Sequence, residues 1–98
     1  MTTITVQDLK DKMAQNETLN LIDVRELHER QEFNIGGLHI PLGNIQTLQI
    51  DDIEHLKEEQ VFLYCRSGNR SGIAAMVLET AGFKNVVNVV GGMLAWQG

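Results

Sequence analysis

Three short, β-rich and almost wholly apolar segments limit the folds open to this 98-residue chain. They read LNLIDV at residues 19–24, VFLYC at residues 61–65 and VVNVV at residues 86–90. A strand with one face in water alternates apolar and polar residues, whereas a strand covered on both faces is apolar nearly throughout. The three segments therefore predict the buried strands of a parallel sheet.

Shorter β-rich pieces at residues 3–5 and 38–40 predict two further strands, and helical patterns lie between the five. A capping box of Thr5 and Asp8 opens the first predicted helix, which places Leu9 and Met13 on one face. The other helical patterns cover residues 26–33, two short turns within residues 46–56, residues 71–81, and a last turn at residues 93–97. Strands and helices in alternation predict an α/β sandwich with right-handed crossovers. No linker or internal repeat interrupts the pattern, so residues 1–98 are expected to form one domain.

The helix at residues 71–81 has the clearest signal, and Gly82 is placed to end it as a C-terminal cap. Apolar residues recur there at helical spacing, which predicts a stripe that faces the core. The stripe comprises Ile73, Ala74, Val77, Leu78 and Ala81.

Charge and cysteine content exclude several classes of protein. The formal net charge is −5 and the basic residues form no cluster, so no nucleic-acid partner is expected. The longest apolar runs, such as residues 86–90, are too short to span a bilayer, and polar residues follow Met1 where a signal peptide would be apolar. The single cysteine cannot form an internal disulfide. A cytoplasmic protein without a membrane partner is therefore expected.

That one cysteine, Cys65, stands between a buried strand and a strong helix, at the head of a loop rich in hydrogen-bond donors. Ligands of open α/β sheets bind beyond the carboxyl ends of the strands, where helix N-termini offer free N–H groups. Gly68 adopts a positive φ at low cost and Asn69 tolerates one, so the loop can curl into an anion cradle. These N–H groups and the charges of Arg66 and Arg70 are expected to lower the pKa of the thiol. A lone cysteine at a strand end is more often a buried hydrophobe, but the neighbouring arginines and glycine favour an activated nucleophile.

The chain resembles the single-domain rhodaneses, which are thiosulfate sulfurtransferases. The matching pieces are LIDVRE at 21–26, IPL at 40–42, VFLYCRSGNRS at 61–71, AGF at 81–83 and VVGGMLAW at 89–96. The resemblance implies a rhodanese-like sandwich: a central, mostly parallel five-stranded sheet with helices on both faces. One local departure is FNIGGLHIPL, where many relatives read Gly-His-Ile-Pro-Gly-Ala.

The resemblance also implies a reaction. Cys65 is expected to carry sulfane sulfur as a persulfide, taken from thiosulfate or a similar donor and passed to a thiol, cyanide or a sulfur-carrier protein. The loop CRSGNR is typical of thiosulfate users rather than mercaptopyruvate users, and no cofactor is expected. The substrate-binding residues would be those that follow the cysteine, namely Arg66, Ser67, Gly68, Asn69, Arg70 and Ser71.

Two other functions remain open at this point. One is a persulfide-carrying or binding module that relays sulfur to a partner protein without fast turnover. The other, less favoured, is a phosphatase or arsenate reductase, whose loops typically read His-Cys, five residues and Arg. Here Tyr64 precedes the cysteine, and only four residues, RSGN, separate Cys65 from Arg70.

Asp23 and Arg25, at the end of the first long apolar strand, have two interpretations. In the first, they have a functional role: they support the active-site residues or contribute to the charge that the substrate meets. In the second, they form an ordinary ion pair on the surface. The three histidines show no ligand spacing, and no metal site is expected.

Overall fold

Five parallel strands form one sheet in this computed structural model, which describes residues 1–98. Their order across the sheet is β1-β5-β4-β2-β3, and every neighbouring pair is parallel. The strands are β1 (Thr2–Thr5), β2 (Asn20–Asp23), β3 (Leu38–His39), β4 (Gln60–Tyr64) and β5 (Asn85–Val90). The expected five-stranded sheet is thus confirmed, and it is parallel throughout.

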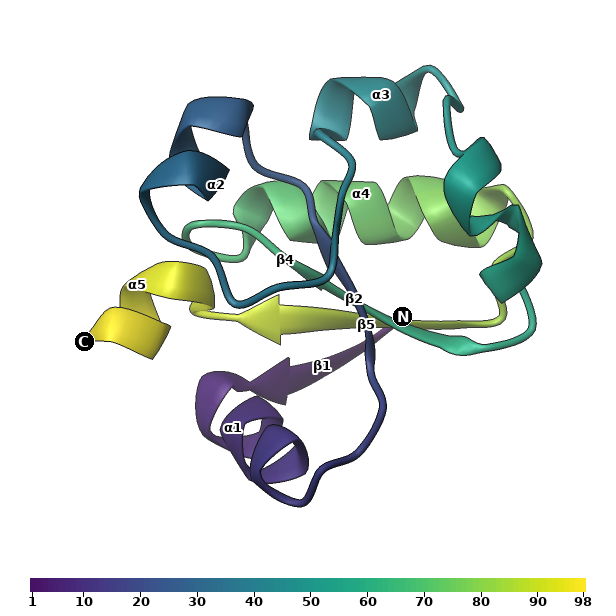
Figure 1. Ribbon diagram of the computed structural model, residues 1–98. Helices are drawn as coiled ribbons and strands as arrows, with labels where there is room; N and C mark the ends of the chain where they lie inside the picture. The colour runs from purple at the N-terminus through teal and green to yellow at the C-terminus, as the bar shows by residue number, and fades with distance from the viewer.

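Helices cover both faces of this sheet (Figure 1). They are α1 (Val6–Ala14), α2 (Leu27–Glu32), α3 (Leu42–Gln46), the 3-10 helix η1 (Asp51–Leu56), α4 (Asn69–Thr80) and α5 (Gly92–Gln97). Thr5 caps α1, because its hydroxyl accepts a hydrogen bond from the Asp8 N–H at 3.1 Å, but the reciprocal bond of the expected capping box, from the Thr5 N–H to the Asp8 carboxylate, is not formed. Two short turns were expected within residues 46–56, but only η1 lies there, because the other short helix, α3, begins at Leu42 and ends at Gln46.

Each face of the sheet has its own core. On the face of α3, η1 and α4, a cluster of buried residues includes Ile22, Ile45 and Leu63. On the face of α1 and α5, a second cluster includes Leu9 and Phe62. Alternate residues of the central strand β4, Phe62 and Leu63, pack on opposite faces, which is why that strand is apolar throughout.

The predicted stripe of α4 is wrong in one position. Ile73 is 45% exposed, whereas Ala74, Ala75 and Leu78 are fully buried. The two small alanine side chains face the sheet, so the contact face of α4 is centred on them and Ile73 lies at its edge. None of the helices combines the length and apolar character needed to cross a membrane, and α4 itself has 12 residues.

The parallel arrangement brings the carboxyl ends of the strands to one edge of the sheet. Asp23 ends β2, Cys65 follows β4, and Gly91 follows β5. Three segments that are far apart in the sequence therefore meet there, and the candidate site lies at this edge.

Candidate active site

Cys65 directly follows β4 and its side chain is fully buried. Gly68 has a φ of +102° and is the N-cap residue of α4, so the chain reverses within three residues of the cysteine. A side chain at this φ would be strained, which explains the glycine. Asn69 is already the first residue of α4, so only Gly68 takes the left-handed conformation that the sequence allowed at both positions.

The loop directs hydrogen-bond donors at the cysteine sulfur. The backbone N–H groups of Gly68 and Ser71 donate to Sγ, with N···S distances of 3.1 and 3.4 Å, and Ser71 Oγ lies 3.3 Å from it. Burial alone raises the pKa of the Cys65 thiol, but hydrogen bonding with the Ser71 side chain and from backbone N–H groups outweighs it and lowers that pKa. A lowered pKa of Cys65 was expected. Its main cause, however, is hydrogen bonding and not the charges of the arginines.

Asn88, on β5, holds this cradle in shape, a role that was not predicted from the sequence. Its side chain is 7% exposed; Oδ1 accepts from the Ser71 hydroxyl at 2.5 Å, and Nδ2 donates to the Gly68 carbonyl at 3.1 Å. Asn88 thereby links the two residues that contact the sulfur. The sequence does contain a signal for this role, because Asn88 is the one polar residue within the apolar run VVNVV. A buried amide needs hydrogen-bond partners.

The two loop arginines have different environments. Arg66 is exposed, and its guanidinium makes no ion pair or hydrogen bond. Arg70 instead donates two hydrogen bonds to the Glu29 carboxylate on α2, at 2.6 and 2.8 Å. This pairing lowers the pKa of Glu29 to about 2 and raises that of Arg70. Glu29 was not foreseen, since 41 residues separate it from Arg70 and nothing local connects them.

The interpretation of Asp23 and Arg25 as a surface ion pair is wrong. Asp23 is fully buried and Arg25 is 4% exposed. The guanidinium donates to both carboxylate oxygens of Asp23 at 2.9 Å, and the Arg25 N–H donates to one of them at 3.0 Å. The pair is buried because the α2 segment covers the carboxyl end of β2. Without that cover, the end of the strand would lie in solvent.

This buried pair is joined to α2. Arg25 also donates to the Phe33 carbonyl at 2.6 Å, just after α2, and Arg30 of α2 lies 3.4 Å from the Asp23 carboxylate. Because α2 also carries Glu29, a continuous set of contacts runs from Asp23 through α2 to the cysteine loop.

Gly92 allows α5 to begin against the cysteine loop. The N–H groups of Met93 and Leu94 donate to the carbonyls of Cys65 and Arg66, at 3.0 and 2.9 Å. A Cβ on Gly92 would collide with the carbonyl oxygen of Cys65 and would lie 2.6 Å from that of Arg66. The second glycine of the motif VVGGMLAW is therefore required for close backbone packing.

We expect Gly92→Ala to disrupt the cradle more than it disrupts the fold. The added methyl group must push the loop carbonyls away, which moves the N–H groups aimed at Sγ. Alkylation of Cys65 by iodoacetamide at neutral pH should slow by about tenfold as the thiolate loses donors. Gly43→Ala is the matched control, because a Cβ at Gly43 meets nothing within 4 Å. Unchanged alkylation in Gly92→Ala would show that the loop does not depend on this contact.

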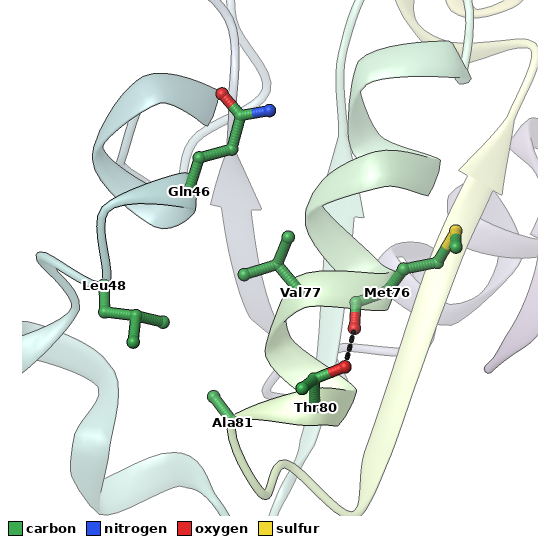
Figure 2. A pocket seen from close by; sticks show the side chains of 6 residues that line it. All are labelled: Gln46, Leu48, Met76, Val77, Thr80 and Ala81. Atoms are coloured by element: carbon green, nitrogen blue, oxygen red, sulfur yellow. Dashed lines mark hydrogen bonds between the residues drawn. The ribbon is translucent and has the colours of Figure 1, made fainter.

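A separate apolar groove of about 410 Å³ lies between α3 and the C-terminal half of α4 (Figure 2). It contains no nucleophile and no titratable side chain, and it is at the opposite end of α4 from the cysteine loop. Its lining residues are Gln46, Leu48, Met76, Val77, Thr80 and Ala81. The chemistry of the molecule is therefore concentrated at the carboxyl edge of the sheet.

The fold and the loop together define a class of protein: parallel α/β domains that hold a cysteine sulfur in a cradle of backbone N–H groups. A family model described as the rhodanese-like domain matches residues 5–98. The chain belongs to the rhodanese-like domain family, as its resemblance to the rhodaneses indicated.

Relatives with similar sequences support this assignment. "Putative sulfurtransferase YtwF" of Bacillus subtilis is 41% identical over 97 residues, which cover 97% of this chain and 89% of YtwF. "Putative sulfur carrier protein YrkF" of the same organism is 38% identical over 96 residues, 97% of this chain, and this chain spans only 50% of YrkF. The crystal structure of a rhodanese-like domain protein from Staphylococcus aureus matches with a TM-score of 0.85 and 31% identity, covering 98% of this chain and 91% of that one.

Proposed function

We propose that the protein is a sulfurtransferase that moves sulfane sulfur from thiosulfate, or a similar donor, to a thiophilic acceptor through a persulfide on Cys65. The observation that carries the proposal is the set of N–H donors from Gly68 and Ser71 aimed at the sulfur of the only cysteine. Such donors stabilise a sulfur anion, which both the resting thiolate and the persulfide require. The family and the names of its relatives support sulfur transfer in general.

The first half-reaction forms the persulfide. The Cys65 thiolate attacks the outer sulfur of thiosulfate, the bond between the two sulfur atoms of the donor breaks, and sulfite leaves with the electron pair. The terminal sulfur of Cys65–S–S⁻ then carries the negative charge, within reach of the N–H groups of the loop from Arg66 to Ser71.

The second half-reaction returns the enzyme to its starting state. An acceptor nucleophile attacks the terminal sulfur, the bond from that sulfur to Cys65 Sγ breaks, and Sγ recovers the electron pair as a thiolate. Because sulfite leaves before the acceptor reacts, ping-pong kinetics are expected.

A sulfur-carrying module is the second candidate, and the name of YrkF, "Putative sulfur carrier protein YrkF", favours it. Such a module would form the same persulfide but pass it only to a partner protein. A steady-state assay with thiosulfate and cyanide, together with the intact mass after thiosulfate treatment, separates the two. Turnover with parallel double-reciprocal plots supports the enzyme; a stable adduct without turnover supports the carrier; no adduct contradicts both.

Arg66→Ala should raise KM for thiosulfate by about tenfold, with kcat little changed. Arg66 is the loop cation without a partner, so it is free to bind the dianionic donor. Arg70→Ala should lower kcat as well, because its bonds to Glu29 hold the loop against α2. Raising salt should weaken donor binding in the parent and matter less in Arg66→Ala.

Steady-state kinetics across a salt series test this pair of variants, with Lys84→Ala as the control for loss of an exposed cation away from the loop. An unchanged KM in Arg66→Ala, with a native circular dichroism spectrum, would mean that the backbone cradle alone recruits the donor.

A further inference from the structure

A groove of about 240 Å³ opens beside the cysteine loop, between α2 and α5. Figure 1 shows these two helices on the same side of the molecule, on either side of the turn from β4 to α4. Arg66 lines the groove from the loop, Glu32 and Phe33 line it from α2 and the residue after it, and Met93 lines it from α5. Pockets for drug-sized ligands start at about 300 Å³, so this groove suits a smaller molecule.

The charges of the groove fall into two kinds. Arg25 and Glu29 also line it, but Arg25 is bound to Asp23 and Glu29 is bound to Arg70. Arg66 and Glu32 are exposed, and neither side chain makes an ion pair or a hydrogen bond within the protein. The groove therefore presents one free cation and one free carboxylate above an apolar floor that includes the buried Met93.

We propose that this groove binds the sulfur acceptor and that the acceptor is a small zwitterionic thiol, with its carboxylate on Arg66 and its ammonium group on Glu32. The inference rests on the proposed function and names the acceptor class for the same site. An amino-acid thiol or a short peptide thiol has this combination of charges. Cyanide and simple mercapto acids lack the ammonium group.

The position of the groove suits the second half-reaction. Arg66 is the residue next to Cys65, and the N–H groups of Met93 and Leu94, which also line the groove, bind the carbonyls of Cys65 and Arg66, so the groove adjoins the cysteine loop. The donor has left before the acceptor enters, which lets Arg66 contact each in turn. Glu32 has no role with the donor, because a carboxylate repels thiosulfate and attracts only the acceptor's ammonium group.

The transfer balances without another reactant. The acceptor thiol gives its proton to the terminal sulfur of the Cys65–S–S⁻ anion, the resulting acceptor thiolate attacks that sulfur, and a new bond forms between the two sulfur atoms. The bond from the terminal sulfur to Cys65 Sγ breaks, Sγ leaves as the thiolate, and the proton remains on the new small-molecule persulfide. The sulfur atom that moves keeps its oxidation level, so no oxidant or reductant is consumed.

The experiment uses single turnovers of the full chain. Cys65 is first converted to the persulfide with thiosulfate, excess donor is removed, and the loss of the adduct is followed by intact mass with cysteine, N-acetylcysteine or cyanide. In Glu32→Gln, the second-order rate constant with cysteine should fall about five- to tenfold, as one charge-assisted contact is lost. The constants with N-acetylcysteine and cyanide should stay the same or rise. Each thiol is compared with itself across variants, so differences in intrinsic thiol reactivity cancel.

Glu59→Gln is the matched control, because Glu59 is an exposed carboxylate on the turn before β4, at the other end of that strand from the cysteine loop. It should leave all three rate constants unchanged. An unchanged constant for cysteine in Glu32→Gln overturns the inference, and so does an equal loss for all three acceptors. In both cases loading by thiosulfate persists and the proposed function stands, whereas failure of loading in the parent protein overturns the proposed function itself.

Discussion

Cys65→Ser is expected to lower sulfur transfer from thiosulfate by about 10³-fold or more, to the level of a protein without the nucleophile. The chain has no other thiol, so no second residue can form the persulfide. Intact mass should show one added sulfur atom after thiosulfate treatment of the parent and none in the variant. Peptide mapping of the parent should place the added atom on Cys65.

The substitution exchanges sulfur for oxygen at a fully buried position, so the fold should persist. Circular dichroism and thermal unfolding of both proteins check this. An adduct that survives in Cys65→Ser would place the chemistry elsewhere, and turnover without any adduct would contradict the covalent route.

Asp23→Asn should reduce the free energy of unfolding by about 3–5 kcal/mol, as for other buried ion pairs that lose one partner. The carboxylate accepts two hydrogen bonds from the Arg25 guanidinium and one from the Arg25 N–H, all away from water. The amide keeps the shape but removes the charge, so the guanidinium of Arg25 stays buried without a counter-charge. A typical domain is stable by about 5–15 kcal/mol, so the loss is a large share of the total.

Equilibrium unfolding in urea measures this loss. Asp51→Asn is the control, because Asp51 is exposed and such changes stay within about 0.5 kcal/mol. A loss below about 1 kcal/mol in Asp23→Asn would mean that the buried pair contributes little. Because α2 is tied to Asp23 through Arg25 and Arg30, the variant should also slow persulfide formation under conditions in which it is still folded.

The sequence alone determined the architecture. The apolar segments that became β2, β4 and β5 are buried on both faces, and such strands in alternation with helical segments are typical of a sheet covered by helices on each side. The cradle was also predictable, because its donors lie within six residues of Cys65 and the reversal at Gly68 is a local property of the backbone. Short-range patterns of this kind depend on residues that are close together in the chain, so they can be predicted from the sequence.

Only the tertiary structure decided which polar groups are partners. Arg70 binds Glu29, Ser71 binds Asn88, and Glu32 shares a groove with Arg66. Each pair joins segments that meet because parallel strands bring their carboxyl ends to one edge. The burial of Asp23 and Arg25 was likewise undetermined, since the two residues are close in sequence whether or not α2 covers them. The partner and the solvent exposure of a charged side chain depend on how distant segments pack, and no local pattern encodes that.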